Sequence, residues 1–193
     1  MDFGSGSIVS RELLPNETVL WQGRPDIKKM FTKSDIFLVP YSLLWGGFTI
    51  FWFIKATSAG GRFGLVGIAF VIVGLYFIFG RFLVKEADKK KTYYAITNNR
   101  VLVVKIDRNG MKKSIASAYI NSVPTESVDV DRNGFGTILF GTPPYWQSMY
   151  MNTGMDLFIW YAQTNLVAFF DIENCENVYK IYNGVKQQQL AKQ

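Results

Sequence analysis

The sequence predicts two fold classes in one chain, a membrane-spanning α-helical hairpin and an α+β domain with a curved antiparallel sheet closed by one helix. Three observations support this. Two long apolar runs without charge lie close together between residues 36 and 80. Short alternating runs of β-type residues follow from Thr92 onward. Near the end, the apolar spacing changes from that of a strand to that of a helix. A chain of 193 residues is long enough for a small domain with a membrane anchor.

The composition excludes several classes of function. The chain has no histidine, which removes the commonest general base, the usual serine and cysteine nucleophile pairs and most zinc sites. Cys175 is the only cysteine, so no internal disulfide can form, which fits a reducing, cytosolic environment. The formal charge is +6, and basic residues cluster beside the apolar runs. This favours anionic phospholipids over nucleic acid, for which no binding motif is present.

Residues 1–35 are predicted to form a cytoplasmic N-terminal segment. Its first residues lack the apolar core of a signal peptide, so membrane insertion must use internal segments. Residues 17–25, "ETVLWQGRP", alternate as a strand does. We expect either an extra edge strand on the sheet that follows, or a stretch that lies along the membrane through Leu20 and Trp21.

Residues 36–84 are predicted to form the transmembrane hairpin. Residues 36–54 carry no charge, and a helix of that length covers about 28 Å, close to the thickness of a hydrocarbon core. Residues 63–80 are also uncharged, and Arg81 then precedes a last apolar triplet, so that its side chain could snorkel to the headgroups. A pair of buried soluble helices is disfavoured because both runs are apolar on all sides. The short connector makes the two helices antiparallel neighbours.

The basic residues predict the orientation of the hairpin. They stand on both outer flanks, whereas the connector carries only Lys55 and Arg62. By the positive-inside rule both termini are cytoplasmic, and we expect a multi-pass protein of the prokaryotic inner membrane. Residues 85–91 are predicted to be a basic juxtamembrane linker. The flanking basic residues are Arg24, Lys28, Lys29 and Lys33 on one side, and Arg81, Lys85, Lys89, Lys90 and Lys91 on the other.

Residues 92–193 are predicted to form a cytoplasmic domain of short strands. "DRNG" occurs at residues 107–110 and 131–134, and each copy is typical of a hairpin turn in which glycine supplies a positive φ. Asn98 and Asn99 suit a tight reversal because asparagine tolerates the left-handed conformation. Strand-like runs cover residues 92–97, 101–107, 113–120, 125–130, 136–140, 157–161 and 166–170.

The last element is predicted to be an amphipathic helix. Val178, Ile181, Tyr182 and Val185 have the i, i+3, i+4, i+7 spacing of one apolar helix face, and Asn174 suits an N-cap. One helix after about seven strands would close the open end of a curved antiparallel sheet or partly open barrel.

This order of elements resembles a pleckstrin-homology (PH) domain, and the whole chain resembles bacterial membrane proteins that carry a PH-like domain. The resemblance rests on "ELLPNETVLWQGRP" at residues 12–25, the two apolar runs, "TYYAITNNRVL" at residues 92–102 and "GTILFGTPP" at residues 136–144. It implies a PH-like fold on the cytoplasmic face, a role in the cell envelope and no enzymatic activity. Residues 145–165 depart from the simplest pattern.

The resemblance also bears on lipid recognition. PH domains that read phosphoinositides hold the headgroup with several basic residues around the first hairpin loop. Here that loop is taken to be "NNR", with one arginine. This argues against specific recognition of an inositol phosphate.

A less specific lipid contact is expected where the chain leaves the membrane. Each cation near an anionic surface contributes about 1 kcal/mol. The alternative is that these residues only fix the orientation of the hairpin. The candidate headgroup contacts are Arg81, Lys85, Lys89, Lys90 and Lys91.

Two further sets of residues are candidates for contact with a partner or a second copy. Gly67 and Gly74 share one helix face and would let another helix approach closely, although glycine is also common in membrane helices. Methionine and aromatic side chains adapt to partner surfaces, and a run of them follows residue 144. That run either contacts a protein, dips into the headgroups or belongs to the core. Its candidate residues are Tyr145, Trp146, Met149, Tyr150 and Met151.

Together these observations predict a noncatalytic membrane module that binds an unknown protein partner or assembles as a homo-oligomeric scaffold. We expect no catalytic residue, metal or cofactor. A subunit of an oligomeric channel or transporter is the alternative. An enzyme acting on lipid or envelope precursors is less favoured, because no nucleophile motif, P-loop or spaced pair of carboxylates is recognisable.

Overall fold

The computed structural model describes residues 8–58, 63–107, 109–155 and 167–191, and it divides into two compact units. The first, here called the β unit, combines the described residues of Met1–Lys29, Ala87–Pro144 and Ala162–Gln193. The second, here called the hairpin unit, combines those of Met30–Glu86 and Tyr145–Tyr161. Both units are therefore built from segments that are discontinuous in the sequence.

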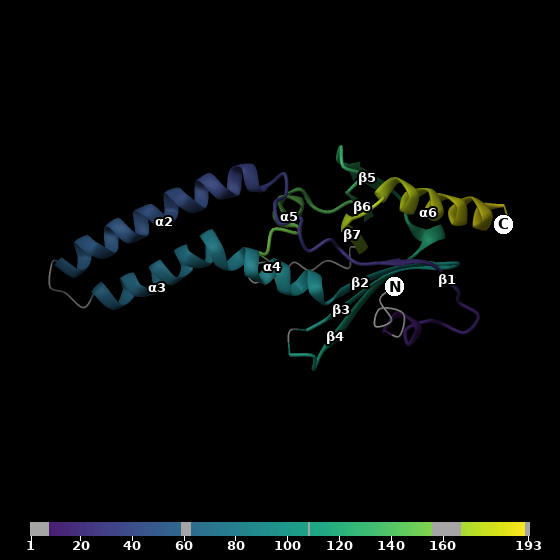
Figure 1. Cartoon of the computed structure of the whole chain (residues 1–193), viewed down its shortest axis with the longest axis horizontal. Coiled ribbons are helices and arrows are strands. Elements are labelled where there is room, and N and C mark those ends of the chain that lie inside the picture. The colour runs from purple at the N-terminus through teal and green to yellow at the C-terminus, as the bar shows by residue number, and fades with distance from the viewer. Residues whose placement is uncertain (1–7, 59–62, 108, 156–166, 192–193) are drawn as a thin grey trace. The chain divides into compact units, whose positions relative to one another are not determined.

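The hairpin unit contains the two predicted apolar helices, which run antiparallel and side by side (Figure 1). The first is α2 (Asp35–Ser58). The second consists of α3 (Phe63–Leu75), a π-helical turn η1 (Tyr76–Gly80) and α4 (Arg81–Lys90), of which the residues from Ala87 onward belong to the β unit. Asp35–Ser58 and Gly67–Lys90 are each 24 residues long and apolar enough to cross a membrane. Residues 85–90 of the predicted linker are part of α4, so the helix continues past the apolar run.

The π-helical turn interrupts the second helix just before its first basic residue. The N–H of Arg81 bonds to the carbonyl of Tyr76, five residues earlier, which is the hydrogen-bond pattern of a π-turn. Gly80 is needed there, because a Cβ at this position would lie 2.8 Å from the ring of Tyr76. The extra residue changes the direction in which the side chains of α4 project.

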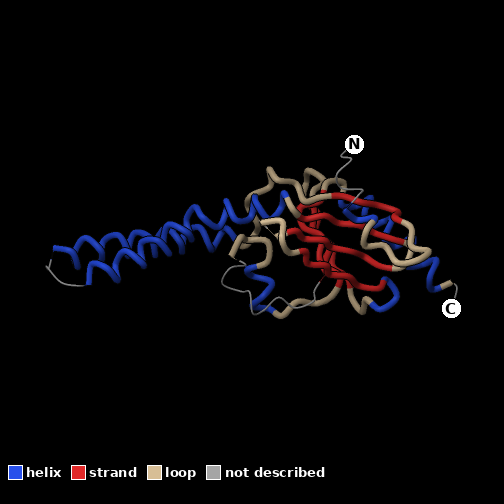
Figure 2. Tube along the Cα trace, turned by 90° about the horizontal axis from the view of Figure 1, so that it is seen from below, coloured by secondary structure: helices blue, strands red, loops and turns tan. Residues whose placement is uncertain are grey.

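The β unit contains two antiparallel sheets and a C-terminal helix (Figure 2). The four-stranded sheet has the order β1 (Val19–Gly23), β2 (Thr92–Thr97), β3 (Arg100–Ile106) and β4 (Lys113–Tyr119). The three-stranded sheet has the order β5 (Glu126–Val130), β6 (Gly136–Phe140) and β7 (Val167–Ile172). The strands after residue 91 match the predicted runs closely, except residues 157–161, which lie outside the described residues.

The N-terminal segment supplies the edge strand that was one of the two expectations for it. Strand β1 pairs antiparallel with β2, from Val19 opposite Thr97 to Gly23 opposite Tyr94. The ring of Trp21 lies 5.6 Å from that of Phe169, in the core of the β unit. Trp21 therefore packs against protein, although Leu20 on the other face of the strand is exposed.

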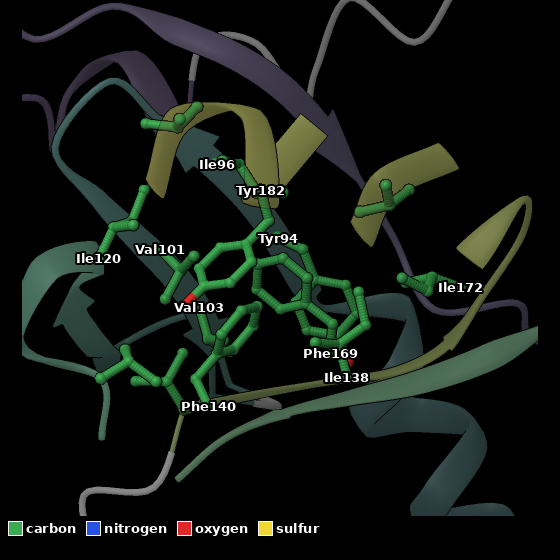
Figure 3. Close-up of a cluster of buried hydrophobic side chains, with 14 of the residues drawn as sticks. Tyr94, Ile96, Val101, Val103, Ile120, Ile138, Phe140, Phe169, Ile172 and Tyr182 are labelled. Carbon is green, nitrogen blue, oxygen red and sulfur yellow. The ribbon is translucent and has the colours of Figure 1, made fainter. Parts of the chain in front are cut away.

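The main core lies between the two sheets and the last helix, and aromatic rings fill its centre (Figure 3). The ring of Phe169 lies 4.7 Å from that of Tyr94 and 5.0 Å from that of Phe140, and Tyr182 lies 5.0 Å from Phe140. Alternate residues of β2 and β3 point into this core, whereas the intervening ones join a smaller cluster with Val9. The N-terminal residues thus cover the second face of β2 and β3, which explains why both strands are almost entirely buried.

The C-terminal helix α6 (Cys175–Leu190) buries the predicted stripe through Val178, Tyr182 and Val185. Its start differs from the prediction. Asn174 is left-handed, with φ of 52°, and its side chain makes no capping hydrogen bond. The first turn is held by backbone contacts instead, since the N–H of Cys175 donates to the carbonyl of Gly134 at 3.0 Å.

The turns confirm one prediction and correct another. Gly110 and Gly134, the last residues of the two "DRNG" copies, have φ of 71° and 80°. Asn98 and Asn99 do not adopt a positive φ. Side chains hold that reversal instead, because the hydroxyl of Thr97 accepts from the N–H groups of Asn99 and Arg100 at 3.2 and 2.9 Å.

Candidate functional site

The first basic residue of α4 forms a buried ion pair at the base of the hairpin. Nη1 of Arg81 lies 2.5 Å from Oδ1 of Asp35, the first residue of α2, and both side chains are almost completely buried. The other carboxylate oxygen accepts from the N–H and hydroxyl of Thr32, at 2.5 and 2.8 Å. The guanidinium of Arg81 also lies 4.3 Å from the ring centre of Phe82. The pair therefore joins the start of one span to the end of the other.

Two lysines further along α4 are also directed inward. In the hairpin unit, Nζ of Lys85 donates to the carbonyl of Met30 at 2.6 Å. In the β unit, Nζ of Lys89 lies 2.7 Å from Oδ2 of Asp171 and donates to the carbonyl of Asp26 at 2.8 Å. Asp171 has φ of 50° and lies where the register between β6 and β7 shifts, which indicates that the irregular strand holds the carboxylate in place.

These contacts place three of the five candidate headgroup residues against protein groups, and the headgroup contact itself stays a prediction. Arg81, Lys85 and Lys89 have 1, 3 and 4% of their surface exposed, and their charges are used inside the protein. Lys91 is half-buried, and its Nζ lies 3.3 Å from the carbonyl of Asp107. Lys90 is the exposed member of the set. The sequence shows a row of cations at the membrane exit, but it does not show the protein acceptors that bury three of them.

The two glycines of the second span are also used within the chain. A Cβ at Gly74 would lie 3.0 Å from Oγ1 of Thr49 and 3.5 Å from Cα of Gly46, and one at Gly67 would lie 2.6 Å from the ring of Phe53. All three neighbours belong to α2. The helix that approaches this glycine face is the first helix of the same hairpin, and contact of these glycines with another chain stays a prediction.

The methionine- and tyrosine-containing run forms a short helix, α5 (Tyr145–Tyr150), in the hairpin unit. The segment is attached to the second span, because the hydroxyl of Tyr76 donates to the carbonyl of Gly154 at 2.8 Å. Tyr145 is 82% exposed and Met149 43% exposed, whereas Tyr150 and Met151 are half-buried. The side chain of Trp146 lies outside the described residues.

A second buried ion pair lies in the β unit, at the turn between β2 and β3. Nε and Nη2 of Arg100 donate to the two carboxylate oxygens of Glu17 at 2.9 and 3.1 Å, and Nη2 also donates to the carbonyl of Glu12 at 2.7 Å. Thr97 donates to the same carboxylate at 2.7 Å. Burial opposes ionisation, but the hydrogen bonds from Arg100, Leu14 and Thr97 hold the pKa of Glu17 below its usual value. The single arginine of "NNR" is thus bound by a carboxylate.

Asp35, Glu17 and Asp171 were not singled out from the sequence, although each holds a buried cation. One signal was present for the first of them. Asp35 directly precedes one uncharged run and Arg81 directly follows the other, so an antiparallel hairpin brings them to the same end. The other two pairs join residues far apart in the chain and have no comparable signal.

The remaining reactive group is the thiol of Cys175. It is fully buried, and burial raises its pKa to about 11, so little thiolate exists at neutral pH. Among the described residues, no group of three or more histidine, cysteine, aspartate or glutamate side chains is placed to hold a metal ion. Comparison of the chain with family models, curated proteins and solved structures found no match.

Proposed function

We propose that the chain is a noncatalytic membrane module, in which a two-span hairpin anchors a PH-like domain that acts as a binding or self-assembling scaffold. The observation that carries this proposal is the reversed distribution of side chains in α2. Its buried residues are Asp35, Ser42, Gly46 and Thr49, whereas Phe37 and Leu44 are 76 and 73% exposed. A soluble helix places its apolar side chains inside, so this arrangement favours lipid as the surrounding medium.

The polar groups between the spans support an anchor more than a conducting path. The hydroxyls of Ser42 and Thr49 donate to carbonyls of their own helix, of Val39 and Gly46, at 2.8 and 2.9 Å. Asp35 is paired with Arg81. These groups stabilise the hairpin itself, and the proposal of a channel or transporter subunit is therefore the weaker one.

Strand pairing supports the proposed topology. Strands β1 and β2 are direct neighbours in one sheet, yet the whole hairpin lies between them in the sequence. Two paired strands must be on the same side of a membrane, which requires an even number of crossings. Together with the basic flanks, this supports two spans with both termini in the cytoplasm, and we propose the prokaryotic inner membrane as the location.

The strand order supports a PH-like domain. Sheets of four and three antiparallel strands, followed by one C-terminal helix, are the elements that the resemblance implies. In this reading β1 is the first strand, so the membrane hairpin occupies the first strand connection, in the place where phosphoinositide-reading PH domains hold their headgroup. The loop "NNR" is then the second strand connection, so the engagement of Arg100 by Glu17 does not bear on that headgroup position.

Extraction and protease accessibility test the proposal together. We expect the full chain to stay in the membrane pellet after treatment with alkaline carbonate. We also expect an added protease to cut a C-terminal tag only when it has access to the cytoplasmic face of the membrane. Release by carbonate would exclude the anchor, and cleavage from the outer face of sealed cells would exclude the topology. Cross-linking in native membranes tests assembly, for which we expect one defined oligomer rather than a ladder of collision products.

A further inference from the structure

We propose that α5 is a third membrane contact of this chain, a short helix that lies in the headgroup region beside the end of the second span. The proposal rests on the anchoring function proposed above. In this proposal, lipid headgroups of the same bilayer contact the exposed surface of α5. Contact with a protein partner is the alternative that the experiment must exclude.

The segment that follows α5 is attached to the second helix of the hairpin. Tyr76 bonds to the carbonyl of Gly154, and Gly154 lies so close to the helix that a Cβ there would be 1.9 Å from the carbonyl oxygen of Arg81. Gly154 has φ of 78°, so glycine is favoured both by the backbone and by the contact. The segment after α5 is therefore fixed to the second helix between Tyr76 and Arg81.

This attachment point lies at the end of the apolar surface of the hairpin. Phe79 and Leu83 are 65 and 68% exposed, so the apolar surface of the second span continues past Arg81. On the first span it begins at Ile36, directly after Asp35. The ion pair and the attachment of Gly154 thus lie at the end of this apolar surface, where in the proposed anchor the hydrocarbon core gives way to headgroups.

The chemistry of the segment also suits an interface. Residues 141–155 contain no charged residue. Tyr145 and Met149 are one turn apart and both exposed, whereas Thr153 and Gly154 are buried against the hairpin unit. The exposed side of α5 also carries Ser148, whose hydroxyl donates to the carbonyl of Tyr145 at 2.6 Å. A short helix with exposed tyrosine and methionine side chains and no charge suits the membrane interface.

A fluorescent probe placed on α5 tests this inference in the full-length protein. We would introduce Met149→Cys, label it with an environment-sensitive dye, and reconstitute the protein in phosphatidylethanolamine–phosphatidylglycerol vesicles. Lipids that carry a quencher near the headgroup should reduce the emission, and the emission should be shifted to the blue. The matched control is Met111→Cys, an exposed methionine of the β unit, which should show neither effect. The native Cys175 should label little, since it is buried and its pKa is about 11.

A third site separates failure of this inference from failure of the anchor. Leu44→Cys lies on the exposed face of α2 and should be quenched by lipids that carry the quencher deep in the acyl chain. If Leu44→Cys is quenched but Met149→Cys behaves like Met111→Cys, α5 is not a membrane contact. If the Met149→Cys probe is shielded from water in native membranes but not in the lipid vesicles, a protein partner covers the surface of α5. That result would overturn the proposal. If Leu44→Cys is not quenched either, the anchor itself is wrong.

Discussion

The two units of this chain sort the same kinds of side chain in opposite directions. Helix α2 of the hairpin unit buries Ser42 and Thr49 and exposes Phe37. The β unit buries Phe140 and Phe169 at the centre of its core. A core of apolar rings is stable in water because the hydrophobic effect favours burial of apolar surface. Small polar residues between two helices with apolar outer faces are the arrangement favoured in lipid. The hairpin unit thus has the side-chain distribution that a lipid environment favours, and the β unit has the one that water favours.

Two buried ion pairs, one from each unit, differ in how completely they are hydrogen-bonded. In the β unit, Glu17 and Arg100 share two hydrogen bonds, and neighbouring groups complete the network. In the hairpin unit, Arg81 and Asp35 are in contact, but the guanidinium nitrogens have no hydrogen-bond partner of good geometry among the described residues. The hairpin pair depends on charge attraction, which is stronger where water is excluded.

The largest effect that we expect comes from the aromatic core of the β unit. Phe169→Ala should lower the free energy of unfolding by about 3–5 kcal/mol, because it removes a fully buried ring that contacts three others. Denaturant unfolding of the full chain in detergent micelles measures this. Phe37→Ala, on the exposed face of α2, should change the value by less than about 0.5 kcal/mol. Equal losses in the two variants would contradict the contrast between the units.

The hairpin ion pair gives the next largest effect. Arg81→Met leaves the carboxylate of Asp35 buried without its cation and should destabilise the hairpin by about 3 kcal/mol. The double variant Asp35→Asn with Arg81→Met should recover most of that loss, because no unpaired charge is left. Thermal unfolding in micelles compares the single and double variants. Losses that simply add would show that the two residues do not stabilise each other.

Close packing of the spans gives an intermediate effect. Gly74→Leu should cost about 1–3 kcal/mol, because the new side chain meets Thr49 and the backbone of Gly46. Gly47→Leu is the matched control, since nothing lies within 4 Å of a Cβ at that position. The same thermal measurement applies, combined with the mass of the protein in detergent. A change of mass without a change of stability would return Gly74 to the role of an oligomer contact.

The smallest effect is the pH dependence that Glu17 contributes. Its pKa in the folded β unit lies below the reference value of 4.5, so its stabilising contribution is complete above about pH 4.5 and is lost as the pH falls through the lower folded value. Glu17→Gln should therefore make stability depend less steeply on pH over that acid range. Denaturant midpoints measured at a series of acid pH values provide the comparison. An unchanged slope would show that the carboxyl group is not ionised in the fold.

The sequence was sufficient for the features that are local in the chain. The apolar runs predict both helices, and the alternation of residues 92–97 and 101–106 predicts two neighbouring strands. The acids that bury the cations could not be chosen in the same way, because Glu17 and Arg100 are 83 residues apart and only the folded sheet brings them together. The spacing of Gly67 and Gly74 showed that a helix could approach closely, but spacing alone cannot say which helix.

The pairing of β1 with β2 has a consequence for how the protein is made. Strand β1 leaves the ribosome first, and 68 residues separate it from the strand that it must join. At about 5–20 residues per second, β1 waits roughly 3–14 seconds for its neighbour. Both apolar helices are synthesised during this delay, so the membrane insertion that we propose for them would begin before the first sheet can close. In the proposed anchor, insertion therefore precedes completion of the β unit.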